Sequence, residues 1–568
     1  SARDRTPAAD QLGGLWGIEQ KLGPRGLGEL VVDGGSSEWK ASITGLQVPV
    51  SREGDNLKFV LPNGAGEFRA HFKDSGKSLT GFWIQPANAV FDNRYASPIH
   101  FRQIGNRRWQ GQVAALEQGI SLYVSVQREP DGALNAFIRN PEFNPPFCRR
   151  LYHVELQGTT VSLSQGKFSL QGSFDSQTDT LALSLIDGQA PLQLSRRVVR
   201  DAPGFYPRVQ VRGKYAYTPP ATDGDGWRVG TLREAGFDEG PIAQLIQKIL
   251  DANPKDNPLP IQSLTIARHG KLVLDEYFYG FHRDRPHDTR SAGKTFAPML
   301  VGMARARGAR IGPDTPVYSL FSRYEPFANW DERKQKMRLK DLMSMTAGYD
   351  CDEDHGDFPG NEDAMQGQTT QPDWYKYMLD APMAHDPGGD RAYYCSGELN
   401  LAAGAAAVAT NTWLPYIFEE DCARPLQFRP YAVNLMPTGQ AYFGGGAYIR
   451  PRDQLKLGQL YLSGGIWNGR RVIDAEWVRQ SLIRHSTFED RFGVDHQYGW
   501  GWHIHHLKVG GKTYVEYESG GNGGQLVLII PQLDMVVGMT GGAYGEFGKW
   551  GHWSLELVPD YVIRAVKS

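Results

Sequence analysis

The chain has 568 residues, which is too long for a single hydrophobic core, so two to four domains are expected. Hydrophobic residues make up 40% of the chain, charged residues make up 22%, and the formal net charge is −2. This balance excludes the strongly basic surface typical of nucleic-acid-binding proteins, and no apolar run approaches the roughly 20 residues of a membrane-spanning helix. We therefore expect no nucleic-acid partner and no transmembrane segment. The sequence does not indicate an oligomeric state.

The chain begins Ser-Ala-Arg-Asp, without Met and without a hydrophobic signal core. We expect a mature form from which a secretion signal has been removed. A periplasmic or secreted location follows from this expectation, and a cytoplasmic location is the alternative.

The first 205 residues consist of short alternating apolar and polar segments broken by Gly, Asp and Asn, which is typical of antiparallel β-sheet. One unit begins at Trp16-Gly17 and a similar one at Trp109-Gln110-Gly111, and each ends in a hairpin-like stretch. We predict an all-β accessory region (1–205) of two repeats, about 12–105 and 106–200. Two small lipocalin-like barrels or sheets fit this period better than one sandwich. The sequence does not indicate what this region does.

Residues 206–226 are rich in Pro, Gly, Tyr and Asp and are predicted to be a linker. The pattern then changes to that of an α+β domain over 227–568, so the protein as a whole is predicted to be multidomain. An amphipathic helix is expected at 237–250, followed by a hairpin that turns at His269-Gly270. A mostly helical region comes next, and strands return from 498 to 539.

Ser291 and Lys294 open the first helix of the helical region and carry the strongest chemical signal. Residues three apart lie on one face of a helix, about one turn from each other, so the amine can reach the hydroxyl. A lysine whose charged form is disfavoured by burial can take the hydroxyl proton and activate the serine. The same spacing at 37–40 and 164–167 lies in β-patterned sequence, where residues three apart point to opposite faces. An ordinary serine at a helix start is the alternative for Ser291.

Two further motifs follow at long range. Tyr394-Cys395-Ser396 comes about one hundred residues after Ser291, and the run Glu-Ser-Gly-Gly-Asn-Gly-Gly occupies 518–524. With S-x-x-K first, this order resembles the serine β-lactamase and penicillin-binding-protein-like family, in the class C-like branch that includes esterases and D-aminopeptidases. Stretches at 339–348, 444–453 and 498–502 resemble the same branch. The resemblance covers about 227–568.

The resemblance implies that Ser291 is the acylated nucleophile and that Lys294 is its proton partner. Tyr394 would act as base and acid, with the pKa of its phenol lowered by a nearby lysine ammonium. A packed aromatic is the alternative for Tyr394. Ser396 would hold the substrate or leaving group by hydrogen bonds, and a helix N-cap is the alternative.

The resemblance also implies an oxyanion hole. It would combine the backbone N–H of Ser291 with one from Gly520, Gly521 or Asn522, and Gly521 is the preferred donor. Glycines suit this place because a substrate carbonyl must approach the backbone closely.

The third motif departs from the family pattern. Relatives carry Lys or His where this chain has Glu518, or Ser519 if the register slips by one residue. A lysine there helps to bind the carboxylate of a β-lactam or a D-Ala terminus, whereas a glutamate would repel it and could receive an amine. We therefore expect a serine hydrolase acting on a small ester or amide, of esterase or aminopeptidase/amidase type. A β-lactamase or DD-peptidase is the alternative enzyme, and a catalytically silent binding protein is the alternative that is not an enzyme. For Glu518 itself, the alternative is a side chain that points into solvent.

Cysteines and acidic residues complete the analysis. The four cysteines allow three pairings, and none has the C-x-x-C spacing. Since H-E-x-x-H is also absent, we expect no zinc site and no cofactor. Because the family fold would place Cys395 at the cleft, we expect Cys351 and Cys395 to lie close together, and to be bridged if the protein is exported. The acidic loop 352–357 could hold a cation, but a solvated loop near the cleft is the favoured interpretation.

Overall fold

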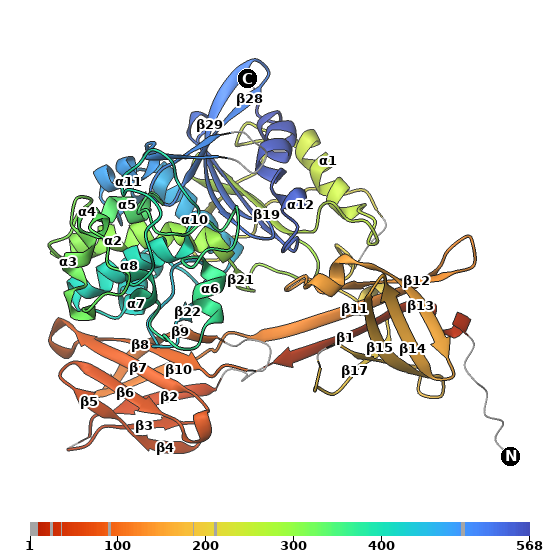
Figure 1. The fold of residues 1–568 in the computed structure, drawn as a ribbon, viewed down its shortest axis with the longest axis horizontal. Coiled ribbons are helices and arrows are strands. Elements are labelled where there is room, and N and C mark those ends of the chain that lie inside the picture. The colour runs from red at the N-terminus through yellow and green to blue at the C-terminus, as the bar shows by residue number, and fades with distance from the viewer. Residues whose placement is uncertain are drawn as a thin grey trace.

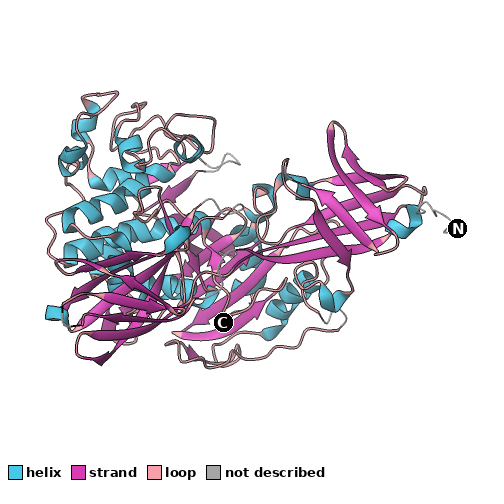
Figure 2. Ribbon diagram, turned by 90° about the horizontal axis from the view of Figure 1, so that it is seen from below, coloured by secondary structure: helices cyan, strands magenta, loops and turns pink. Residues whose placement is uncertain are grey.

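The structure is a computed structural model that describes residues 9–22, 27–35, 37–88, 93–185, 187–209, 213–489 and 495–567. Two strand-rich units lie beside a larger α+β domain (Figure 1). Viewed from below, one strand-rich unit extends away from the α+β domain toward the N-terminus (Figure 2). No helix among these residues is long and apolar enough to cross a membrane.

One unit is a closed barrel with the strand order β1-β11-β12-β13-β14-β15-β16-β17. Its strands are β1 (Gly14–Leu22), β11 (Gln118–Arg128), β12 (Leu134–Arg139), β13 (Leu151–Gln157), β14 (Thr160–Gln165), β15 (Phe168–Asp175), β16 (Thr180–Ser184) and β17 (Leu192–Arg196). Alternate side chains such as Trp16, Leu122 and Tyr152 point inward and form one apolar core.

The other unit is a sheet with the order β4-β3-β2-β10-β9-β8-β7-β6-β5. Its strands are β2 (Gly28–Asp33), β3 (Lys40–Ile43), β4 (Leu46–Pro49), β5 (Ser51–Glu53), β6 (Asn56–Val60), β7 (Glu67–Lys73), β8 (Ser78–Gln85), β9 (Arg94–Gly105) and β10 (Arg108–Val113). Trp39, Trp83 and Trp109 belong to its own apolar core. The all-β prediction for this region is thus confirmed.

The two sheets do not follow the expected division into residues 12–105 and 106–200. Strand β1 closes the barrel by pairing with β11 and β17, whereas β10 pairs with β2 and β9. The β2–β10 sheet is therefore inserted between the first and second strands of the barrel. The reason is physical: alternation tells which side chains point inward, but it does not tell which strand becomes the neighbour.

The α+β domain contains a sheet of order β18-β20-β19-β31-β30-β29-β28-β27-β26. Its strands are β18 (Arg228–Val229), β19 (Ile261–Arg268), β20 (Lys271–Tyr277), β26 (Ser486–Phe488), β27 (His496–Tyr498), β28 (His503–Val509), β29 (Lys512–Gly521), β30 (Gln525–Ile530) and β31 (Met535–Gly541). Short strand pairs are β21 (His287–Asp288) with β23 (Tyr448–Ile449), and β24 (Ile466–Trp467) with β25 (Arg470–Arg471). The sheet joins strands from both ends of the domain, as the sequence predicts.

Helices fill the middle of this domain. They are α1 (Glu239–Leu250), α2 (Phe296–Ala306), α3 (Val317–Leu320), α4 (Arg333–Lys336), α5 (Leu339–Met343), α6 (Glu362–Gly367), α7 (Trp374–Leu379), α8 (Ser396–Thr410), α9 (Leu414–Ile417), α10 (Pro451–Leu462), α11 (Ala475–Leu482) and α12 (Phe547–Trp550), followed by the helical segment Trp553–Ile563. Helix α1 begins two residues later than expected, because the Asp238 side chain accepts the N–H of Gly240 and caps the helix. His269 and Gly270 both have positive φ and form the predicted hairpin turn.

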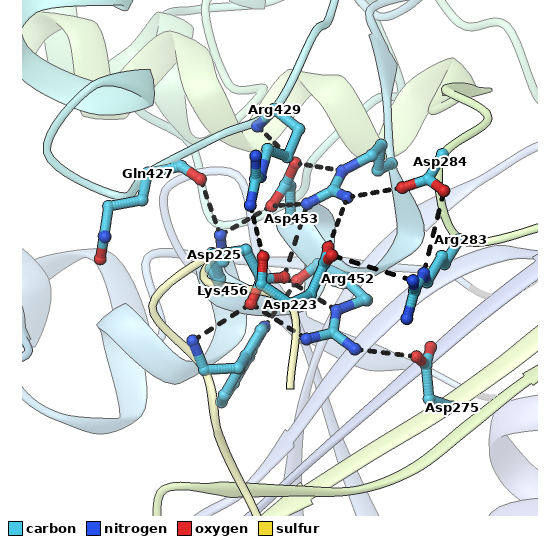
Figure 3. Close-up of polar contacts among 12 residues, drawn as sticks. Asp223, Asp225, Asp275, Arg283, Asp284, Gln427, Arg429, Arg452, Asp453 and Lys456 are labelled. Atoms are coloured by element: carbon cyan, nitrogen blue, oxygen red, sulfur yellow. Dashed lines mark hydrogen bonds and ion pairs between the residues drawn. The ribbon is translucent and has the colours of Figure 1, made fainter. Parts of the chain in front are cut away.

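The end of the predicted linker is packed against the α+β domain. Asp225 is fully buried, and its two carboxylate oxygens accept hydrogen bonds of 2.8 and 3.0 Å from the guanidinium of the equally buried Arg452 (Figure 3). Arg450, Asp453 and Lys456 extend the same buried network of ion pairs. This segment is therefore fixed by a charged anchor and does not behave as a free connection.

Both N-terminal units contact the α+β domain. Strand β22 (Val433–Leu435) pairs antiparallel with residues 94–96 at the start of β9 in the β2–β10 sheet, and Phe82 and Ile84 of β8 belong to the main core of the α+β domain. The barrel is held by hydrogen bonds from Asn144 Nδ2 to the carbonyl of Tyr544 and from Gln262 Nε2 to the carbonyl of Pro141.

Candidate active site

Ser291 lies in a short 3₁₀ helix, Arg290–Thr295, that runs directly into α2. Because a 3₁₀ helix has three residues per turn, side chains three apart lie one above the other. The Lys294 amine is accordingly 2.7 Å from the Ser291 hydroxyl. Ser291 lines a cleft, whereas Lys294 is only 3% exposed behind it. The two side chains are thus placed for direct proton transfer.

Burial lowers the pKa of Lys294 below its ordinary value, since the ammonium form loses its hydration. The carboxylates of Glu362, Glu353 and Asp354 act in the opposite direction but do not outweigh burial. A neutral amine beside a serine hydroxyl can accept the hydroxyl proton.

Tyr394 reaches the nucleophile from the segment before α8. The Lys294 amine lies 4.9 Å from the centre of its ring, and its hydroxyl forms a hydrogen bond with Ser291. Burial nevertheless raises the pKa of Tyr394 well above its ordinary value, and Glu353 raises it further. The predicted lowering of this pKa is therefore wrong, because desolvation of the phenolate outweighs the hydrogen bond from Ser291, which lowers the pKa. Tyr394 is set up to donate a proton.

Gly521 brings the end of β29 against the turn that contains Ser291. A Cβ atom added at Gly521 would lie 2.5 Å from the carbonyl oxygen of Thr289 and 3.0 Å from the amide nitrogen of Ser291. Only glycine permits this approach. The backbones of Ser291 and Gly521 are consequently side by side, as an oxyanion hole requires, and Gly520 and Asn522 also line the cleft.

Ser519 is buried and links β29 to the short helix that contains Ser291. Its hydroxyl donates to the carbonyl of Ala292 over 2.9 Å and lies 2.7 Å from Oγ1 of Thr295. Of Glu518 and Ser519, Glu518 is the one that lines the cleft, and its Oε2 accepts a hydrogen bond of 2.7 Å from the Ser554 hydroxyl. The alternative in which Glu518 points away into solvent is thus wrong.

Ser396 has a different role from the one implied by the family pattern. It is fully buried as the first residue of α8, and its hydroxyl and its backbone N–H each donate to the Glu353 carboxylate over 2.6 Å. Ser396 therefore does not reach the substrate cleft, which Glu353 lines instead. Burial raises the pKa of Glu353, and the neighbouring Glu362 raises it further.

Glu353 is a residue that the sequence analysis missed, because an acidic loop is ordinarily solvated. Cys351 and Cys395 form a disulfide with their Cα atoms 5.8 Å apart, which confirms that they lie close together. The backbone N–H of Glu353 also donates to the carbonyl of Tyr394 over 2.9 Å. These links fasten the acidic loop to the start of α8 and turn Glu353 into the site. Cys148 and Cys422 are free and buried.

The cleft has a volume of about 470 Å³. Of the described residues that line it, seven are acidic, three are histidines, and none is Lys or Arg. The acidic residues are Glu353, Asp354, Asp357, Glu362, Asp363, Glu489 and Glu518, and the histidines are His496, His503 and His505. The wall around Ser291 is therefore strongly negative unless protons or cations neutralise it.

The chain matches known proteins over this part of its length. A family model described as Beta-lactamase matches residues 246–544. The 6-aminohexanoate-dimer hydrolase of Paenarthrobacter ureafaciens is 26% identical over 237 residues, which cover 38% of this chain and 56% of that protein. The D-alanyl-D-alanine-carboxypeptidase/endopeptidase AmpH of Escherichia coli (strain K12) is 25% identical over 183 residues, which cover 28% of this chain and 46% of that protein. The chain thus spans about half the length of the curated relatives it matches.

Two solved structures are similar to part of this chain. A putative 6-aminohexanoate-dimer hydrolase from Bacillus anthracis is 17% identical, with a TM-score of 0.45, and the match covers 62% of this chain and 90% of that one. A putative beta-lactamase from Bacteroides dorei DSM 17855 is 19% identical, with a TM-score of 0.47, and the match covers 58% of this chain and 100% of that one.

Proposed function

The chain belongs to the beta-lactamase family, and from this premise we propose that it is a serine hydrolase that cleaves ester or amide bonds of a small substrate through an acyl-enzyme on Ser291. The observation that carries the proposal is the 2.7 Å contact between the Ser291 hydroxyl and the amine of buried Lys294, at the edge of a cleft. A hydroxyl needs such a base because it is a weak nucleophile on its own.

In the proposed reaction, Lys294 Nζ takes the proton of Ser291 as Oγ attacks the substrate carbonyl carbon. The oxyanion that forms is stabilised by the backbone N–H groups of Ser291 and Gly521. The bond to the leaving alcohol or amine then breaks, and the leaving group receives a proton from the Tyr394 hydroxyl. In the second half of the reaction, water attacks the acyl-enzyme and gives its proton to the Tyr394 phenolate. Lys294 returns its proton to Oγ of Ser291 as the acid is released, and both residues recover their starting states.

The negative cleft wall supports a substrate class. A carboxylate brought into a cleft lined by seven acidic residues meets like charges in a partly desolvated space, which opposes binding. Neutral esters and amides, or substrates that carry an amine, avoid this cost. We therefore propose that such substrates react faster than penicillins and other carboxylate-bearing β-lactams.

The experiment combines active-site labelling with kinetics. A fluorophosphonate probe should add to Ser291, as read by mass spectrometry, and Ser291→Ala should abolish both the adduct and the hydrolysis of p-nitrophenyl acetate. Ser164→Ala is the matched control, since Ser164 has the same S-x-x-K spacing but lies in β14 of the barrel. It should keep the wild-type rate.

Substrate charge is tested with three substrates in the presence of EDTA: a neutral p-nitrophenyl ester, an amino-acid p-nitroanilide and nitrocefin. The expected order of kcat/KM places nitrocefin last. Retained esterase activity in Ser291→Ala would refute the nucleophile assignment, and wild type that gives neither adduct nor turnover would be a silent binding protein. A wild type that prefers nitrocefin by orders of magnitude would be a β-lactamase.

A further inference from the structure

One wall of the cleft carries histidines and glutamates on a single face of the sheet. In the β28–β29 ladder His503 is paired with Glu518, and His505 is paired with Glu516. Paired residues of antiparallel strands point to the same face, and so do residues two apart on one strand. All four side chains therefore share the face that borders the cleft. His496 of β27 joins them, with its ring stacked on His505 at 4.8 Å between ring centres.

Three of these residues converge at one point. Each of His505, Glu516 and Glu518 offers a nitrogen or oxygen atom, and these atoms all lie within 4.8 Å of one another. Nε2 of His505 is 3.7 Å from Oε2 of Glu518. Two ligands of a tetrahedral zinc ion, each about 2.1 Å from the metal, are about 3.4 Å apart. The ligand atoms of the three side chains are therefore somewhat farther apart than those around a bound zinc ion. Small side-chain movements would bring them to bonding distance.

Glu516 supplies the independent observation. It is fully buried, and neither of its carboxylate oxygens has a hydrogen-bond partner among the residues that the structure describes. Burying a carboxyl group without partners is costly, and native proteins nearly always avoid it. The buried Asp225, by contrast, receives two hydrogen bonds from Arg452. Glu516 is therefore left with bonding capacity directed at His505 and Glu518.

We propose that His505, Glu516 and Glu518 bind a divalent transition-metal ion of the Zn²⁺ type. One imidazole nitrogen with two carboxylate oxygens is a ligand set that suits zinc and its first-row neighbours. Because His505 and Glu518 line the cleft that Ser291 also lines, an ion held by these side chains would be accessible from the cleft to a water molecule or a substrate oxygen. The site does not include Ser291 or Lys294, so the proposal of metal binding does not depend on the proposed hydrolase mechanism.

The usual zinc patterns miss this site for a structural reason. C-x-x-C and H-E-x-x-H describe ligands on knuckles and helices, with the spacing those elements impose. On strands the period is two, so the corresponding signature is H-x-H at 503–505 facing E-x-E at 516–518 across a hairpin.

Metal binding is tested on the full chain, without reference to activity. Protein freed of metal with EDTA and dialysed is titrated with ZnCl₂ by isothermal titration calorimetry, and metal content is measured by mass spectrometry. Wild type should bind one Zn²⁺ per chain and gain thermal stability on binding. Glu516→Gln keeps the side-chain shape and should weaken zinc binding by more than the roughly 10–100-fold loss typical of removing a mere supporting group.

His506→Asn is the matched control, because His506 is on the same strand but is exposed on the opposite face. It should keep the wild-type affinity. If Glu516→Gln does not fold, Glu518→Gln, at the cleft surface, provides the same comparison. Zinc binding below one ion per chain, or equal affinity in wild type and in the Glu516 or Glu518 variant, would overturn the proposal and leave Glu516 as a buried protonated acid.

Discussion

Replacing Lys294 with methionine should lower kcat/KM for a p-nitrophenyl ester by about 10²–10⁴-fold, the usual contribution of a general base. The amine is 2.7 Å from the Ser291 hydroxyl, within the range for direct proton transfer, and no other base is needed. Methionine fills a similar volume and leaves no buried charge, so the variant should fold. Lys294→Arg should be equally impaired, because an arginine cannot give up its proton.

Tyr394→Phe is the companion variant that separates the two roles. Since burial raises the pKa of Tyr394, the phenolate is scarce near neutral pH and the hydroxyl acts as an acid. A p-nitrophenolate leaving group needs no proton, whereas an anilide does. Tyr394→Phe should therefore slow the anilide much more than the ester, and Lys294→Met should slow both.

The pH dependence follows from the sign of the lysine shift. Burial lowers the pKa of Lys294, and only the neutral amine can act as the base. The kcat/KM of wild type for the ester should therefore rise as the pH increases through the pKa of Lys294. This rise should occur at a pH below the ordinary pKa of a lysine. The Lys294→Met variant should lack this rising limb. One outcome would refute the reasoning from burial and identify Tyr394 as the base. In it, kcat/KM for the ester would stay within about threefold of wild type in Lys294→Met and fall by at least about 100-fold in Tyr394→Phe.

Two further predictions concern contacts away from the nucleophile. Asp225→Ala should lower the free energy of unfolding, measured by urea denaturation, by about 3–5 kcal/mol, because it leaves the buried Arg452 without this partner. Asp284→Ala removes an exposed partner of the same network and should lower it by less than about 1 kcal/mol. Equal losses in the two variants would contradict the anchoring role of Asp225. Ser396→Ala removes a hydrogen bond to the Glu353 carboxylate and should cost about 1.5–3 kcal/mol of stability without a specific rise in KM. A higher KM with unchanged stability would instead mean that Ser396 contacts the substrate.

The parts of the fold that the sequence predicted are those set by local patterns. Alternation identified the all-β region, and the i, i+3 spacing placed Lys294 beside Ser291 because both lie in one helical turn. The order of strands was not predictable, since the partner of β1 lies about one hundred residues further along the chain. Likewise, the composition of residues 206–226 suggested a linker, although Asp225 finds its partner in Arg452 of α10.

Within the site, motifs predicted which residues come together but not what their surroundings do to them. The pKa of Tyr394 depends on the burial of its hydroxyl and on the nearby carboxylates, and neither can be read from the residue order. Ser396 has the expected position but is turned toward Glu353, a residue 43 positions earlier that the Cys351–Cys395 disulfide brings to α8. Long-range packing decides both outcomes.

The N-terminal region shares a core with the helix that follows Ser291. Phe82 and Ile84 of β8 are buried in the core that also contains Phe296 and Met299 of α2, the helix that continues from Ser291. Burial of side chains of this size contributes about 1.5–3 kcal/mol each, which is a large share of the net stability of a domain. A chain that lacks residues 1–205 would expose the part of this core that Phe82 and Ile84 cover, and β22 would lose its strand partner β9. The β2–β10 sheet therefore contributes to the same core as the helix that follows Ser291.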